Sequence, residues 1–211
     1  MNKIKVIIAG AGGHARSCIG ALESNSVYEL VGIIDNQLKK GDFLLGYPVL
    51  GADEDLDEVK KVSDNLHLGV GQIKSNAVRV KLYHLYKKKG FNLINLEAGS
   101  SLISKHVKTG GANTFMHNSF VDVGCKIGHN NIFNTGCIIE HDVEIGNHNH
   151  ISTGVIINGE VEIGDNNFIG SGTTIANNVT ISNNIIIGAG SLVINDLTEE
   201  GVYYGTPAKK K

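Results

Sequence analysis

The sequence predicts an α/β Rossmann-like half domain over residues 1–96, followed by a left-handed parallel β-helix of hexapeptide repeats over residues 97–211, including a C-terminal tail. From Val121 to Val193, an aliphatic or aromatic residue returns at every sixth position without a slip. The next residue is often glycine, as at Gly128, Gly146, Gly164, Gly170 and Gly188. Helices and plain strands lack this period, whereas parallel β-helices are built from hexapeptides. The first 96 residues instead alternate apolar strands with helices, as small parallel α/β domains do.

The strands of the first domain are expected at residues 5–9, 30–34, 47–51, 66–71 and 91–94. A glycine turn at 10–15 follows the first strand and opens a helix that runs to about Asn25. Two further helices are expected at 53–61 and 74–89. The alternation stops near residues 95–100, and the domain boundary is placed there.

In the second domain three hexads make one coil of about eighteen residues, so that positions one coil apart stack. Ile103, Thr109 and Phe115 extend the register backward, and the β-helix is expected over about 97–198. The hexads carry no insertion after Val121. The segment 202–208 breaks the register and is expected to fold back over the last coil.

Two sets of side chains lead to predictions about packing. Cys125 and Cys137 both occupy the fifth hexad position, where a small buried residue fits, and we interpret them as reduced packing residues. Val155, Val161 and Val179 are expected on a flat, half-apolar outer wall. Burying such a wall favours an oligomer.

Composition excludes several classes of protein. The 211-residue chain has a formal charge of −2 and no basic stripe, which argues against a nucleic-acid partner. It has neither an apolar run long enough to span a bilayer nor a signal-peptide pattern. We therefore expect no membrane partner and a cytoplasmic location.

The glycine turn Gly10-x-Gly12-x-x-Ala15 stands between a strand and a helix, as in dinucleotide-binding domains. A helix N-terminus at Gly12 and Gly13 can bind a phosphate, and Asp35 ends the next strand, where a ribose-binding acid is expected. The domain holds little more than one mononucleotide half, which favours a nucleotide-linked substrate over NAD. The alternative is a turn that needs glycine only for packing.

The nine histidines raise the question of a metal. His117, His129 and His141 share the third hexad position but lie twelve residues apart, hence on three different faces of one chain. They cannot converge within a subunit, and His148-x-His150 is a weak ligand pair. No metal is therefore expected, although a zinc site across a trimer interface stays an alternative.

His141 is the candidate base. It lies in the segment Ile139-Glu140-His141-Asp142, between two carboxylates that could orient the imidazole and raise its basicity. One coil later stands Gly159, whose missing side chain would leave a slot for a thioester and a backbone N–H for its oxyanion. The alternative is a surface histidine between solvated acids.

The chain resembles the bacterial sugar acetyltransferases of the sialic acid O-acetyltransferase and UDP-4-amino-sugar N-acetyltransferase group, over nearly its whole length. The motifs that carry this resemblance are Gly10-Ala-Gly-Gly-His14, Ile34-Asp35-Asn36, Gly69-Val-Gly71, Asn134-Thr-x3-Ile139-Glu-His141-Asp and Gly205-Thr-Pro-Ala208. Some members have Glu where this chain has Asp142, which is shorter.

The resemblance implies roles for individual residues. His141 would be the general base, and Asp142 would tune it. Acetyl-CoA would contact His150, Gly159 and Ser171, and Asn134 would lie near the acceptor. The first domain would hold the nucleotide-sugar through Gly12, Gly13, His14, Asp35, Asn36 and Gly71. The assembly would be a homotrimer, with CoA in a groove between adjacent subunits.

The expected function is acetyl-CoA-dependent N-acetylation of a nucleotide-linked amino sugar in bacterial surface-glycan biosynthesis, by direct transfer with a histidine base. Three alternatives stay open. They are O-acetylation of sialic acid or a related free sugar, a zinc-dependent hydratase, and a non-catalytic assembly module.

Overall fold

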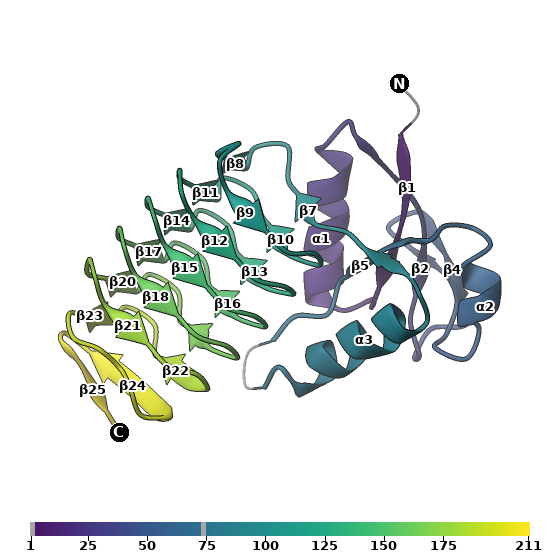
Figure 1. The fold of residues 1–211 in the computed structure, drawn as a ribbon. Helices are drawn as coiled ribbons and strands as arrows, with labels where there is room; N and C mark the ends of the chain where they lie inside the picture. The colour runs from purple at the N-terminus through teal and green to yellow at the C-terminus, as the bar shows by residue number, and fades with distance from the viewer. Residues whose placement is uncertain (1–2, 73–74) are drawn as a thin grey trace. The chain divides into compact units, whose positions relative to one another are not determined.

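The computed structural model describes residues 3–72 and 75–211, which form two compact units (Figure 1). The division falls between Gly99 and Ser100. Among the described residues, no helix is long and apolar enough to cross a membrane.

The first unit contains one mostly parallel sheet with the strand order β3-β4-β2-β1-β5-β6. Its strands are β1 (Ile4–Ala9), β2 (Tyr28–Ile34), β3 (Phe43–Leu44), β4 (Tyr47–Gly51), β5 (Asn65–Leu68) and β6 (Asn92–Leu93). Its helices are α1 (Gly13–Glu23), α2 (Leu56–Val59) and α3 (Ala77–Lys88). The short strand β7 (Leu96–Glu97) is the last element of this unit along the chain. The sequence pattern missed β3, a two-residue strand that pairs antiparallel with β4. Helix α2 is also shorter than expected, and the predicted start of α3 at Lys74 lies outside the described residues.

The topology of this sheet fixes where a ligand can enter. Strand β1 is central and fully buried from Val6 to Ala9, as expected for a parallel strand covered on both faces. The chain runs from β1 outward through β2 to β4, and then returns to place β5 on the other side of β1. The carboxyl ends of β1 and β5 therefore form a topological switch point, where open α/β sheets bind their ligands.

The second unit is a parallel β-helix whose short strands stack in three sheets (Figure 1). Sheet 1 holds β10 (Thr114–Phe115), β13 (Ile132–Phe133), β16 (His150–Ile151), β19 (Phe168–Ile169) and β22 (Ile185–Ile187). Sheet 2 holds β8 (Leu102–Ile103), β11 (Phe120–Val121), β14 (Ile138–Ile139), β17 (Ile156–Ile157), β20 (Thr174–Ile175) and β23 (Leu192–Val193). Sheet 3 holds β9 (Lys108–Thr109), β12 (Lys126–Ile127), β15 (Glu144–Ile145), β18 (Glu162–Ile163) and β21 (Thr180–Ile181). The predicted fold class is confirmed.

Each hexad position has a fixed task in this unit. The first position fills the core, as Phe133 stacks on Ile151 one coil later. Glycine at the second position is needed because a Cβ on Gly128 would lie 2.5 Å from the carbonyl oxygen of Gly146. The fourth position turns the chain with a left-handed backbone, as at Asp142 with φ +58°.

The fifth hexad position points inward. Cys125 and Cys137 are completely buried there, which confirms their packing role. The same position explains why the expectation for Val155, Val161 and Val179 is wrong, since all three are buried rather than exposed. Four asparagines at this position form an internal ladder in which each side-chain oxygen accepts the backbone N–H one coil later: Asn113, Asn131, Asn149 and Asn167.

The apolar outer wall belongs instead to sheet 2. The strand residue before each core position points outward, and in this sheet these residues are mostly apolar: Leu102, Phe120, Ile138, Ile156, Thr174 and Leu192. Leu102 is 63% exposed, and the others are half-buried in the single chain.

The C-terminal segment folds back as expected. Strand β24 (Gly201–Gly205) adds to sheet 1 in parallel with β22, and β25 (Ala208–Lys210) then reverses and pairs antiparallel with β24.

Candidate functional site

The first unit contains a cavity of about 760 Å³ at the carboxyl ends of β1, β2 and β5. Six residues predicted to bind a nucleotide-sugar line it: Gly12, Gly13, His14, Asp35, Asn36 and Gly71. They come from three segments that are distant in sequence, and the parallel sheet brings them together.

The glycines of the turn are present for two different reasons. Gly10 has φ +108°, and a Cβ there would lie 3.0 Å from Val70 Cγ2, so the fold itself needs this glycine. A Cβ on Gly12 or Gly13 would meet no protein atom within 4 Å, and neither residue has a left-handed backbone. Packing therefore explains Gly10 but not Gly12 or Gly13, whose missing side chains leave room for a ligand.

The same turn begins helix α1. Gly12 is the N-cap residue, and it supplies no side-chain hydrogen bond to the first turn, which also lacks acidic residues. The first backbone N–H groups of a helix have no partner within the helix, and its dipole favours negative charge there. This end of the cavity therefore suits a phosphate.

The opposite end of the cavity is acidic. Asp35 Oδ1 accepts the backbone N–H groups of Gln37 and Leu38 at 2.8 and 3.2 Å. Asn36 is paired with Asp53 through two hydrogen bonds, at 2.8 and 2.9 Å.

Tyr86, on α3, completes this end by donating its hydroxyl to Asp53 Oδ1 at 2.7 Å. Burial raises the pKa of Tyr86, and the hydrogen bond and charge of Asp53 raise it further. Sequence reasoning missed Asp53 and Tyr86, because one lies in an acidic stretch and the other looks like an ordinary apolar position of an amphipathic helix.

The candidate base lies in the second unit, at the edge between sheets 2 and 3. His141 Nδ1 lies 3.1 Å from Asp142 Oδ2, and the histidine side chain is 49% exposed. Asp142 can turn back on its neighbour because its backbone is left-handed and because Gly124, one coil earlier, leaves space for its carboxylate. The hydrogen bond that the imidazole donates to Asp142 raises the pKa of His141 above its ordinary value. The negative charges of Glu160 and Asp122 add to this effect.

Gly159 has a role that differs from the predicted one. A Cβ at this position would lie 2.6 Å from Cε1 and 2.7 Å from Nε2 of His141. The imidazole itself therefore fills the space left by the missing side chain, and the expected empty slot for a thioester is absent. What remains of the prediction is the backbone N–H of Gly159, for which the structure gives no acceptor among the described residues.

The remaining predicted residues lie elsewhere on the β-helix. His150 points outward from sheet 1, where it contacts the edge of Phe168 with ring centroids 5.2 Å apart. Asn134 Nδ2 lies 3.5 Å from His150 Nε2. Ser171 follows β19 at the edge between sheets 1 and 2. One chain thus brings His150 near Asn134 but leaves both on a different face from His141.

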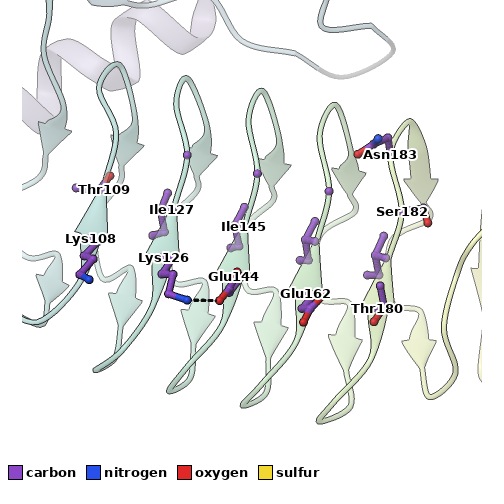
Figure 2. A pocket seen from close by; sticks show the side chains of 15 residues that line it. Lys108, Thr109, Lys126, Ile127, Glu144, Ile145, Glu162, Thr180, Ser182 and Asn183 are labelled. Carbon is purple, nitrogen blue, oxygen red and sulfur yellow. Dashed lines mark hydrogen bonds and ion pairs between the residues drawn. The ribbon is translucent and has the colours of Figure 1, made fainter.

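Sheet 3 carries a separate groove of about 670 Å³, which contains none of the predicted site residues (Figure 2). Its outward strand positions are mostly charged, and Lys126 forms an ion pair with Glu144. Exposed pairs of this kind contribute little to stability. Among the described residues, no group of three histidine, cysteine or acidic side chains is placed to hold a metal.

Comparisons with known proteins agree with this architecture. Residues 5–86 match the family described as PglD N-terminal domain. Perosamine N-acetyltransferase from Caulobacter crescentus, solved as a His-to-Asn mutant with CoA and GDP-perosamine, is 31% identical, with 98% of this chain and 96% of that chain covered and a TM-score of 0.90. PerB from the same organism, with CoA and GDP-perosamine, is also 31% identical, with coverage of 98% and 97% and a TM-score of 0.90.

A more distant structure shares the fold. The acetyltransferase domain of PglB from Neisseria gonorrhoeae FA1090, in complex with acetyl coenzyme A, is 24% identical, with full coverage of both chains (100% and 100%) and a TM-score of 0.89. A comparison with curated protein sequences found no match. The chain therefore belongs to the PglD-type family of sugar acetyltransferases, and it is an acetyltransferase.

Proposed function

We propose that this enzyme transfers the acetyl group of acetyl-CoA to the amino group of a nucleotide-linked amino sugar, as a step in the synthesis of a bacterial surface glycan. The observation that carries the proposal is the His141 imidazole, which Asp142 holds against Gly159 on an exposed edge of the β-helix. The Caulobacter relative, an N-acetyltransferase with CoA and GDP-perosamine bound, supports the choice of substrates.

The nucleotide part of the substrate occupies the cavity of the first unit. Its diphosphate lies at the N-terminus of α1, where Gly12 and Gly13 leave the backbone open. His14, in the first turn of the helix, and Gly71, packed against it, complete this end of the cavity. Asp35 and Asn36 contact the other end of the nucleotide.

His141 acts as the general base. In the neutral tautomer whose Nδ1–H donates to Asp142, Nε2 has a free lone pair. As the amine nitrogen attacks the thioester carbonyl carbon, Nε2 takes a proton from that nitrogen and the new C–N bond forms. The C–S bond then breaks, and the CoA thiolate takes the proton from the imidazolium.

The Gly159 N–H stabilises the oxyanion of the tetrahedral intermediate. Transfer is direct, because none of the described residues beside the base is an activated nucleophile. Cys125, one coil below that region, is buried and donates its thiol to the Glu140 carbonyl at 3.1 Å. Burial raises the pKa of the Cys125 thiol, which keeps it protonated.

An amine suits this edge better than a hydroxyl. Asp122, Glu140, Asp142 and Glu160 surround His141 in the stacked turns, and their negative potential favours a basic nitrogen over a neutral oxygen.

The site is completed by assembly into a homotrimer. Sheet 2, the apolar wall, lies between the edge that carries His141 and the edge that carries Ser171. In a closed ring each copy buries one edge against the opposite edge of its neighbour. Such a contact covers the apolar wall and brings His150, Asn134 and Ser171 of the partner subunit toward His141, so that acetyl-CoA lies between subunits.

The three free, buried cysteines fit the reducing cytoplasm, where we expect the enzyme.

A paired acceptor assay tests the proposal. Purified protein and acetyl-CoA are offered a GDP- or UDP-linked 4-amino sugar, the same nucleotide-sugar with a 4-hydroxyl, and free sialic acid, and CoA release is measured. We expect release only with the amino sugars. Preferential acetylation of sialic acid or of the 4-hydroxyl sugar contradicts the proposal, as does the absence of transfer to every acceptor.

A further inference from the structure

Asp53 and Tyr86 line the cavity of the first unit, yet the proposed acetyl transfer does not involve either residue. Together with Asn36 they join three segments: the end of β2, the segment after β4, and helix α3. Tyr86 is 2% exposed, so its hydroxyl is fixed by packing as well as by its 2.7 Å bond to Asp53.

This network determines how Asn36 is oriented. The backbone N–H of Asp53 can only donate, so the atom it meets at 2.9 Å must be the carboxamide oxygen of Asn36. The Asn36 amide nitrogen then donates to Asp53 Oδ2 at 2.8 Å. One hydrogen and one lone pair of the Asn36 amide are left for a ligand.

Both carboxylates at this end keep acceptor capacity. Asp53 accepts one hydrogen on each oxygen, and an ionised carboxylate has about four lone-pair sites. Asp35 is held through Oδ1 alone, and its Oδ2 has no donor among the described residues. A ligand group that binds here must therefore donate hydrogen bonds.

The cavity thus has a fixed polarity. Donors lie at the N-terminus of α1, and acceptors lie at Asp35 and Asp53; the described lining residues include no lysine or arginine. Val78 and Leu82, also in the lining, offer an apolar surface for a base. A ribonucleoside diphosphate has this order of groups, since its phosphates accept hydrogen bonds and its ribose hydroxyls donate them.

We propose that Asp53, held by Tyr86, is a positioning residue for Asn36, and that this network with Asp35 binds the ribose hydroxyls, so that the enzyme selects ribonucleotide-linked over deoxyribonucleotide-linked sugars. The inference rests on the proposed function and extends it by naming the nucleotide class. A deoxyribose leaves one of these acceptors without its donor inside the occupied cavity, and sites built to bind a hydroxyl reject analogues that lack it.

Calorimetric titration of the full chain tests this inference. The probes are GDP, UDP and their 2′-deoxy counterparts. We expect the wild type to bind each ribonucleotide about tenfold or more tightly than its deoxy counterpart. In Tyr86→Phe and Asp53→Asn, affinity for the ribonucleotides should fall to that for the deoxynucleotides, whose binding should stay unchanged.

Tyr83→Phe is the matched control, because Tyr83 is a buried tyrosine of the same helix that does not line the cavity. It should keep the wild-type preference. Equal wild-type binding of the ribo and deoxy forms overturns the inference. So does a preference that follows the base alone, or an equal loss of both forms in the variants, which indicates a purely structural role. If the wild type binds no nucleoside diphosphate at all, the proposed function fails as well.

Discussion

At the scale of single residues, the proposed chemistry depends on His141 being unprotonated when the acceptor arrives. The hydrogen bond to Asp142 raises the pKa of this histidine, so the acidic limb of the pH–rate profile should lie above the ordinary histidine pKa. The same bond holds the ring in one orientation, with Nε2 beside Gly159.

Replacing Asp142 separates these two effects. In Asp142→Asn the pKa of His141 should fall toward its ordinary value, because the hydrogen-bonded charge is lost. The acidic limb of kcat/KM should therefore move to lower pH, while kcat at the plateau falls about tenfold or more through loss of ring orientation. A pH–rate profile for each protein measures both. An unchanged profile and plateau would show that Asp142 does not act on the base.

Candidate site residues could be predicted from the sequence where they lie in a recognisable motif. His141, Asp142 and the glycines of the first turn stand in recognisable sequence contexts, and the structure places the latter around one cavity. Asp53 and Tyr86 could not be found this way, since their role depends on a three-segment contact that sequence spacing does not encode. The imidazole lying over Gly159 was likewise missed, because stacking predicts the neighbour but not the side-chain direction.

At the scale of elements, the strand–turn–helix of the first unit separates glycines that the fold needs from glycines that packing does not explain. A Cβ on Gly69 would lie 2.7 Å from Ile8 Cγ2 and 3.0 Å from Ala15 Cβ, where β5 approaches α1. A Cβ on Gly12 would meet only open space.

The two alanine substitutions should consequently fail in opposite ways. Gly69→Ala should destabilise the protein by about 1–3 kcal/mol through overpacking. Gly12→Ala should leave the melting temperature nearly unchanged but raise KM for the nucleotide-sugar about tenfold or more, because its methyl group would take the space of the phosphates. Thermal melting and steady-state kinetics measure the pair. A Gly12→Ala enzyme with normal KM would show that the open space is not used by substrate.

The hexad elements illustrate the limits of a period. The six-residue repeat predicted the first-position residues of the β-helix core, because the first residue of each hexad must fill the same stacked column. It did not predict that the valines at the fifth hexad position point inward. Val155 and its equivalents are buried because the chain turns there, after a left-handed residue, and only the contacts between coils reveal this.

At the scale of the whole molecule, the proposed site needs residues that one chain keeps apart. His141 and His150 lie on different faces of the same β-helix. If the proposed ring is correct, each site takes His141 from one subunit and His150 from the next.

Mixed trimers test this arrangement. His141→Ala and His150→Ala homotrimers should each be impaired, yet co-expression of the two should restore up to about a quarter of the sites by random assembly in a closed ring of three. Acetyl transfer by the purified mixture, compared with the two variants mixed without subunit exchange, measures the gain. No gain in the co-expressed protein, or monomers by light scattering, would place the complete site within one chain.

The most direct test of the account is the turnover of His141→Ala with acetyl-CoA and a nucleotide-linked amino sugar, measured as CoA release. The account predicts a loss of roughly 10²–10⁴-fold in kcat, the usual contribution of a general base. Acetyl-CoA binding measured by calorimetry should be retained, because the side chain acts on the proton and not on the cofactor. Near-normal turnover in this variant would contradict the account.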